Sequence, residues 1–510
     1  AVSARMSSYY ASAAFYADNT LIKFQAFGNS EKTYQAWNGV PSYLLDTDRS
    51  YNPCGEYEED GVKIFYNNQT DNYWQHNYHL MASQRIGDFW NMNLTLHYTD
   101  GNGYYEDYKS KAKFSSYKLP EYIDPEGNTV KKTDLVRRKW LDNYFYGAVY
   151  SANYQRDNTR LTLGTAVNNY VGDHFGRVMW TKSANVLPQP DYEYYRNTGK
   201  KLDYNAYAKL TQRLSPLFTG YLDLQYRGIH YTIKGNDDKA GEGLDIRKNW
   251  NFFNPKAGLF WQINTNNRLY GSFSVAHKEP TRNNYTDGKL TEHPKAERLF
   301  DYELGYTFAN SWLNLGANLY YMDYKNQLVL TGEKNEIGEA VAANVPDSYR
   351  MGIELMAGLK LNCGFQWDIN ATFSRNRVEN FSETLYEWED PTTEAWKIDR
   401  GNTPISFSPD FILNNRFSYT YRGFEASLQS QYVSKQYMTN AKRDDQILDA
   451  YFVSNLNLAY TFKLPRMKSV TVGCTIYNLF NETYENNGFA GSGYSLNDAG
   501  EKERYSYATY

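Results

Sequence analysis

The sequence predicts an all-β protein, an antiparallel barrel that crosses a membrane with strands. Three observations support this fold class. Apolar and polar residues alternate with a period of two in many successive runs, as in strands that present one face to each side of a sheet. Short turns and long polar loops alternate along the chain. Tyrosine accounts for 50 of the 510 residues and gathers near strand ends, as in the aromatic girdles of membrane barrels.

The clearest alternation lies between residues 267 and 324. In LFDYELGYTF, Phe300, Tyr302 and Leu304 alternate with Asp301 and Glu303. After a short turn at 310–311, WLNLGANLYYMDY repeats this alternation over a run about twice the usual soluble strand length of ~5–6 residues. A strand of that length suits a membrane.

Short turns rich in Gly, Asn, Asp and Pro separate the predicted strands in pairs. They lie at 17–19, 87–88, 156–158, 214–216, 265–266, 310–311, 362–364, 422–423 and 464–466. The polar stretches between successive turns vary from 435–449 to 29–72. Membrane barrels keep their long loops at one end in this way, whereas a secreted sandwich or propeller, the alternative fold, has no reason to do so.

Taken in order, the predicted strands are 1–8, 9–16, 20–28, 73–86, 89–98, 142–155, 159–170, 203–213, 217–233, 252–263, 267–277, 299–309, 312–324, 349–361, 365–377, 410–421, 423–434, 450–462 and 468–480. Residues 504–510 would begin a twentieth strand. The junction at 6–10 lacks turn chemistry, so a loop is expected to be missing there. An odd count leaves an unpaired edge that cannot face lipid, so we expect the chain to be incomplete.

Composition excludes several classes. No apolar run approaches the ~18 residues of a membrane helix, and a net charge of −4 gives no basic field for nucleic acid. The three cysteines, Cys54, Cys363 and Cys474, have no metal-ligand spacing. No catalytic motif stands in a credible context, so we expect neither an enzyme nor a cofactor nor a resident metal. GNGYYEDY at 101–108 is interpreted as a solvated loop because it lacks the acid spacing of a calcium site.

Several segments resemble the barrel of TonB-dependent outer-membrane receptors of the Bacteroidetes type. They are KEPTRNNYTD (278–287), PKAERLFDYELGY (294–306), the run 320–355, NLFNETYENNGFA (478–490) and the shorter blocks 45–56, 67–80, 97–109 and 173–180. KEPTR departs from the Phe-Arg-Ala-Pro-type motif that related receptors carry at that point. The resemblance implies a 22-stranded barrel preceded by a plug domain. Residues 1–510 would then form an incomplete barrel domain, with the plug, two strands and most of the last strand outside it.

The resemblance also implies a function in the outer membrane, namely active import of a scarce nutrient. A ferric siderophore or another iron complex is the first expectation, driven by the TonB-ExbB-ExbD energy complex acting on the plug. Further expected partners are outer-membrane lipid and a surface lipoprotein. Cobalamin or a glycan is the alternative cargo, although dedicated glycan receptors are usually longer. A surface all-β adhesin is the alternative of another class.

Ligand contacts are expected from loops and loop bases that combine aromatic, polar and basic residues. Aromatic rings would stack on a flat or macrocyclic ligand, and arginine would bind carboxylate or catecholate oxygens. Loop packing or a girdle position is the simpler interpretation of each residue. A histidine haem ligand is disfavoured because it needs a pocket that the sequence does not reveal. The candidate residues are Trp37, Trp74, His174, Arg177, His277 and Arg282.

Overall fold

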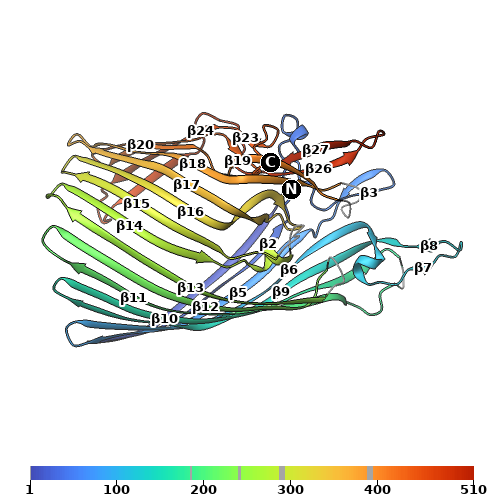
Figure 1. The fold of residues 1–510 in the computed structure, drawn as a ribbon, viewed down its shortest axis with the longest axis horizontal. Coiled ribbons are helices and arrows are strands. Elements are labelled where there is room, and N and C mark those ends of the chain that lie inside the picture. The colour runs from blue at the N-terminus through green and yellow to red at the C-terminus, as the bar shows by residue number, and fades with distance from the viewer. Residues whose placement is uncertain (1, 184–185, 239–242, 287–292, 388–393) are drawn as a thin grey trace. The chain divides into compact units, whose positions relative to one another are not determined.

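A computed structural model describes residues 2–183, 186–238, 243–286, 293–387 and 394–510 (Figure 1). It confirms the all-β prediction, since one antiparallel sheet contains 19 strands. The chain divides into two compact units. Unit 1 comprises Ala1–Asn38, Ser50–Thr211 and Asp223–Asn254, and unit 2 comprises Gly39–Arg49, Gln212–Leu222 and Pro255–Tyr510.

The strands of the large sheet are β1 (Ala4–Ala17), β2 (Thr20–Tyr34), β5 (Thr70–Ile86), β6 (Trp90–Lys113), β9 (Lys132–Arg156), β10 (Thr159–Thr181), β11 (Tyr192–Arg213), β12 (Phe218–Asn236), β13 (Gly243–Gln262), β14 (Asn267–Lys278), β15 (Glu297–Ala309), β16 (Leu313–Lys334), β17 (Ala340–Lys360), β18 (Phe365–Leu385), β19 (Trp396–Pro404), β20 (Phe411–Tyr421), β21 (Phe424–Val433), β24 (Tyr451–Phe462) and β25 (Val470–Ile476). Four small hairpins pair β3 (Glu56–Glu59) with β4 (Val62–Phe65), β7 (Tyr122–Ile123) with β8 (Thr129–Val130), β22 (Gln436–Tyr437) with β23 (Ile447–Leu448), and β26 (Phe489–Leu496) with β27 (Lys502–Thr509). The helical elements are α1 (Arg282–Thr286) and the 3-10 turns η1 (Ser42–Leu44) and η2 (Phe114–Tyr117). Across the described ranges, no helix has the length and apolarity needed to cross a bilayer.

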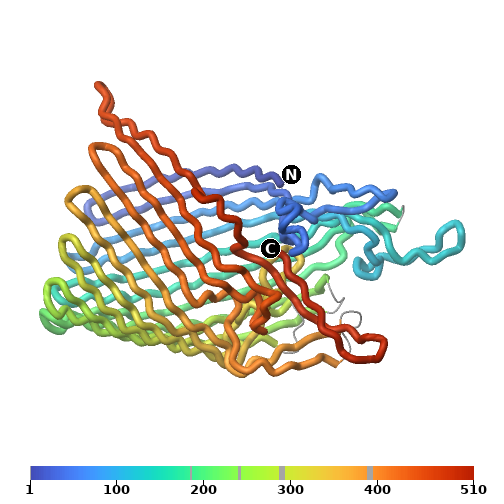
Figure 2. The backbone as a smooth tube through the Cα atoms, turned by 90° about the horizontal axis from the view of Figure 1, so that it is seen from above, coloured from blue at the N-terminus to red at the C-terminus, as the bar shows by residue number. Residues whose placement is uncertain are grey.

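All nine predicted short turns connect neighbouring antiparallel strands. In unit 2, β14 to β18 follow one another side by side in both views (Figures 1 and 2). The turn between β17 and β18 requires its glycine. Gly364 has φ +88°, and an added Cβ would lie 2.0 Å from the carbonyl oxygen of Thr420. Turn chemistry therefore predicted this end of the sheet correctly.

The strand count agrees with the prediction, but its members differ. Residues 1–8 and 9–16 are not two strands, because β1 pairs with β2 without interruption from Ala4 to Ala17. The stretch 6–10 lacks turn chemistry because no turn is there. β19 was not predicted and pairs with the far end of β18. Residues 504–510 do not begin a twentieth strand of the sheet, since 504–509 belong to β27 and pair with β26.

Most strands also extend further toward the long loops than predicted. The predicted strand 89–98 becomes β6, which continues to Lys113, and β9 begins at Lys132 instead of 142. GNGYYEDY is therefore part of a strand and not a solvated loop. Beyond the lipid, either face of a strand can be covered by protein or water, so the period-two pattern fades although the pairing continues.

Apolar and aromatic side chains are exposed on neighbouring strands of the sheet. On unit 2, Tyr302 and Leu304 are exposed opposite Tyr321 and Leu319 of the next strand, which are also exposed. On unit 1, the rings of Tyr78, Tyr98 and Tyr144 form a row with centroids 6.4 Å apart at each step. Exposed apolar side chains of this kind suit lipid, and a row of tyrosines suits its interface.

Buried apolar clusters lie toward the long-loop ends of the strands. In unit 1, one cluster joins η2 to β9, β10 and β11 through Phe114, Leu135, Val178 and Tyr194. In unit 2, Val329, Val345, Val378 and Ile405 form another. Packing of this kind gives the long-loop ends a fixed structure on which a binding site can be built.

Candidate functional site

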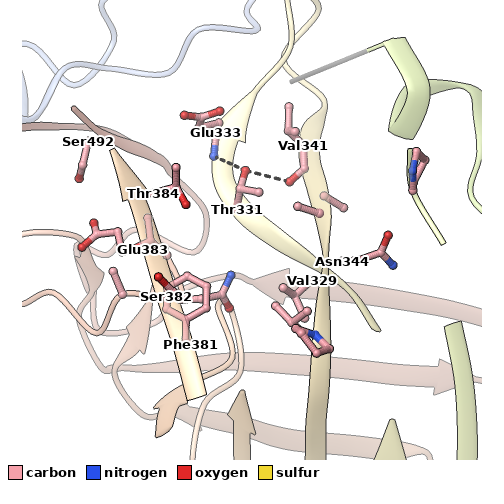
Figure 3. Close-up of a pocket in the computed structure, with 18 of the residues that line it drawn as sticks. Val329, Thr331, Glu333, Val341, Asn344, Phe381, Ser382, Glu383, Thr384 and Ser492 are labelled. Carbon is pink, nitrogen blue, oxygen red and sulfur yellow. Dashed lines mark hydrogen bonds between the residues drawn. The ribbon is translucent and has the colours of Figure 1, made fainter. Parts of the chain in front are cut away.

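A pocket of about 460 Å³ lies in unit 2 at the long-loop ends of β16, β17 and β18, with β26 on one side (Figure 3). Aliphatic side chains of β16 and β17 form one wall, and polar side chains of β18 form another. The lining includes Lys295, Val329, Thr331, Glu333, Val341, Asn344, Phe381, Ser382, Glu383, Thr384, Asn440 and Ser492.

Two asparagines with positive φ lie in the strands that build the pocket. Asn326 in β16 has φ +53° and Asn380 in β18 has φ +49°, a conformation that asparagine tolerates better than most residues. The pairing of β18 with β19 shifts between Val378 and Phe381, around Asn380. Such bulges bend a strand and re-aim its side chains.

Several polar groups in the wall serve to hold the backbone. Asn344 donates from Nδ2 to the carbonyl oxygens of Lys295 (3.0 Å) and Asn326 (2.6 Å). Asn440 donates to the carbonyl oxygen of Leu330 (2.7 Å). Thr331 donates to the carbonyl oxygen of Val341 (3.1 Å) and accepts from the amide of Glu333 (3.2 Å), the two bonds dashed in Figure 3. The pocket is therefore largely preformed.

Glu383 is the buried acid of the pocket. Arg400 donates from Nε (3.0 Å) and Nη2 (2.7 Å) to its Oε2, and Arg504 donates to its Oε1. The side chain of Glu383 is 9% exposed. Because Arg504 belongs to β27, this ion pair also fixes the β26–β27 hairpin against β18.

Three polar side chains face the pocket with no side-chain hydrogen bond to any other described residue. Glu333 comes from β16, and Ser382 and Thr384 come from β18, as Figure 3 shows. A carboxylate and two hydroxyl groups are thus available to a ligand in the pocket.

Of the predicted contact residues, Arg282 lies on a segment that adjoins this pocket. α1 packs beside β17, where Asn283 donates from Nδ2 to Oε2 of Glu339 (2.6 Å). The ring of Tyr285 lies 6.5 Å from that of His293, which lines the pocket. Burial raises the pKa of Tyr285 to about 12. His277 lies at the end of β14, opposite Arg298 of β15.

The other four predicted residues belong to unit 1. Trp37 packs edge-to-face on Tyr105, with centroids 5.3 Å apart. His174 is half-buried in β10. Arg177 lies over the ring of Phe175 at 5.0 Å and 3.7 Å from Glu193.

Trp74 stands on the same face of β5 as Tyr78 and Leu80, and all three are exposed. This placement favours an aromatic girdle position for Trp74. The structure does not test a binding role for any of the six residues, and these roles remain predictions.

The sequence interpretation missed the pocket. Glu383 and its partners Arg400 and Arg504 are far apart in the chain, and nothing in their local sequence links them. It also missed the buried acids of GNGYYEDY. Asp107 pairs with Arg137 (2.8 Å), and Glu106 pairs with Arg138 (2.6 Å) and accepts from Tyr66 (2.6 Å). Among the described residues, no group of three His, Cys, Asp or Glu could hold a metal ion.

Comparisons with known proteins agree with this architecture. The ferric-catecholate import receptor Fiu of E. coli K12 is similar, with a TM-score of 0.64 and 14% identity over 99% of this chain and 74% of that one. The siderophore receptor PiuA of Acinetobacter baumannii gives 0.68 and 12% over 99% and 74%. The ferric yersiniabactin uptake receptor FyuA of Yersinia pestis gives 0.63 and 14% over 99% and 70%. At such identities, the likeness shows the fold alone.

A search of curated proteins finds no significant match. A family model described as "TonB dependent receptor-like, beta-barrel" matches residues 14–479. The chain therefore belongs to the TonB-dependent receptor-like β-barrel family, whose barrels are outer-membrane proteins.

Proposed function

We propose that this chain is the barrel of a receptor that imports a ferric siderophore or another iron complex across the outer membrane. Membership of the family implies TonB-dependent energy coupling and a small-molecule ligand. In this proposal, the TonB-ExbB-ExbD complex supplies the energy. The similar structures support the iron cargo, because their names describe ferric-catecholate, ferric yersiniabactin and siderophore receptors.

The observation that carries the proposal is the preformed pocket at the long-loop end of unit 2. Its volume of about 460 Å³ lies in the ~300–1,000 Å³ range of small-molecule sites. An aliphatic wall beside a few directed polar groups is the usual composition of such a site. Arg282, on the segment that adjoins the pocket, is the predicted contact that we assign to it first.

Trp37, Trp74, His174, Arg177 and His277 remain proposed contacts outside the pocket. Cobalamin or a glycan taken up by the same mechanism is the alternative cargo. An adhesin without transport is disfavoured, because the family consists of receptors that move small molecules.

Growth tests the cargo. A strain that lacks this receptor should lose growth on one iron complex as sole iron source, and collapse of the proton-motive force should stop uptake of that complex by the parent strain. Loss of growth on a cobalamin source with normal use of every iron complex would show that the cargo is cobalamin.

Binding tests the assignment of Arg282. In the purified receptor, Arg282→Ala should weaken binding of that iron complex by about 1–3 kcal/mol, the range of a central contact. Arg268→Ala is the matched control, because Arg268 is an exposed arginine at the turn end of β14. If both variants bind the iron complex with the affinity of the parent protein, Arg282 is not part of the binding site.

A further inference from the structure

The charges around the pocket bear on the class of iron complex that it can hold. Arg400 and Arg504 both donate to Glu383 and compensate its charge. Two guanidinium groups and one carboxylate leave one surplus positive charge. This charge lies behind the pocket wall. The Arg504 side chain is 16% exposed, and its Nε is buried without a hydrogen-bond partner among the described residues.

The remaining charged groups that line the pocket have opposite signs, so their charges offset each other. Among the described lining residues, Lys295 is the only lysine or arginine, and Glu333 is the only acid besides Glu383. Neither wall therefore offers the cluster of cations that a multiply charged anion would need on leaving water.

The uncharged groups suit a neutral ligand. The hydroxyl groups of Ser382 and Thr384 can donate to carbonyl oxygens, and the carboxylate of Glu333 can accept from amide or hydroxyl groups. Val329, Val341 and the ring of Phe381 line the same space and can pack on methylene chains.

We infer that this pocket selects an electroneutral ferric chelate of the trihydroxamate class and discriminates against ferric tris-catecholates. The inference rests on the proposed function. Three monoanionic hydroxamates balance the charge of iron(III), whereas three dianionic catecholates leave a trianion. The Glu333 carboxylate repels that trianion, and the single surplus charge behind Glu383 cannot balance it.

The test measures dissociation constants of the full-length receptor in detergent for two probes, a ferric trihydroxamate and a ferric tris-catecholate. The hydroxamate should bind at least about tenfold more tightly, equivalent to ~1.4 kcal/mol. Ser382→Ala combined with Thr384→Ala should weaken the hydroxamate about tenfold. Ser311→Ala, in the turn at the other end of the strands, is the matched control and should leave both constants unchanged.

Charge reversal supplies a readout that loss of structure cannot imitate. Glu333→Lys should strengthen tris-catecholate binding about tenfold and change hydroxamate binding by less than about threefold. Tighter binding of the catecholate by the parent protein, or no gain from Glu333→Lys, overturns the inference and leaves the iron-importer proposal standing. Binding of neither probe, together with normal growth of the deletion strain on all iron complexes, overturns both.

Discussion

Asp107 and Arg137 are charged side chains that water does not reach, with 4% and 5% exposure. Arg137 donates from Nε (2.8 Å) and Nη2 (3.0 Å) to the two carboxylate oxygens. The pair joins β6 to β9 beside the cluster that contains Leu135 and Tyr194. The buried Arg137 is tolerated there because Asp107 pairs with it, and Lys109 also lies 3.0 Å from the carboxylate of Asp107.

Removing one partner should therefore be costly. Arg137→Ala leaves the buried carboxylate of Asp107 with the part-exposed Lys109 (3.0 Å) as its charged partner. It should destabilise the long-loop end of unit 1 by about 3 kcal/mol, the low end of the range for breaking a buried ion pair. A denaturant titration that is monitored through the hydrogen exchange of residues 104–140 measures this loss of stability. The exposed pair of Arg247 and Asp245 is the matched control, and Arg247→Ala should cost less than ~1 kcal/mol. Equal effects of the two variants would contradict the prediction.

The same pair predicts a pH dependence. Burial would raise the pKa of Asp107, but Arg137 and Lys109 outweigh it and hold the pKa below its usual range. A carboxyl group whose pKa is lower in the folded state contributes stability above its unfolded pKa of ~3.9, and that stability is lost as the pH falls through the folded value. Hydrogen-exchange protection at the long-loop ends of β6 and β9, which in β6 begin beyond Tyr104, should therefore persist down to about pH 4. At lower pH the protection should decrease. The Asp107→Asn variant should have lower exchange protection than the parent protein at neutral pH, and its protection should change little as the pH falls below 4. A parallel fall of protection in the variant and the parent would assign the transition to other groups.

At the scale of elements, the β26–β27 hairpin contributes to the pocket wall from outside the large sheet. Besides the ion pair of Arg504 with Glu383, Gln446 donates from Nε2 to the carbonyl oxygen of Gly491 (2.9 Å). The amide of Tyr494 donates to the carbonyl oxygen of Tyr386 (3.0 Å). A few side chains thus decide how firmly the hairpin is held.

Arg504→Met should loosen this hairpin while leaving the sheet intact. Proteolysis at the exposed turn 497–501 should become about tenfold faster, because ~1.4 kcal/mol of local stability changes the open population tenfold. Cleavage sites on β14 to β18 should keep their rates. Arg466→Met, at an exposed turn between β24 and β25, is the control substitution. General sensitivity along the chain would show that Arg504 supports more than the hairpin.

Sequence reasoning predicted the elements best at their short turns. Asn, Gly and Pro fix turn geometry locally, so the turn at 362–364 could be recognised without knowledge of the strands that it joins. The opposite strand ends could not, because pairing continues in β6 and β9 after the alternation has ended. Missing β19 and dividing β1 into two strands were errors of opposite sign, which is why the count of nineteen agreed.

The site was less predictable for a related reason. The bulge in β18 surrounds a single asparagine, Asn380, and the positive φ of Asn380 and of Asn326 in β16 has no signature in the surrounding residues. The ion pair of the site joins residues from β18, β19 and β27. Arg282 was chosen for the mixed chemistry of its loop, and α1, which contains it, packs beside β17, whose residues line the pocket. The role of Arg282 in binding stays a prediction.

At the scale of the whole molecule, the exposed apolar face should govern behaviour in solution. Leu304, Leu319, Leu80 and Leu96 are all exposed on strands that the family places in the outer membrane. The protein should require detergent, and its unheated form should migrate faster on gels than the boiled form, because a closed barrel binds less denaturing detergent. A detergent-free soluble monomer would contradict the membrane assignment.

The tight turn between β17 and β18 also gives the chain a chemical marker of orientation. Cys363 is exposed in that turn, Cys474 is exposed in β25, and Cys54 is buried. In a Cys474→Ser background, Cys363 is the one exposed thiol among the residues that the structure describes, and a membrane-impermeant maleimide can modify it. Whole cells should resist modification if the short turns face the periplasm, and cells with a permeabilised outer membrane should be labelled at Cys363. Labelling of intact cells would place the short turns, and not the pocket, on the outside of the bacterium.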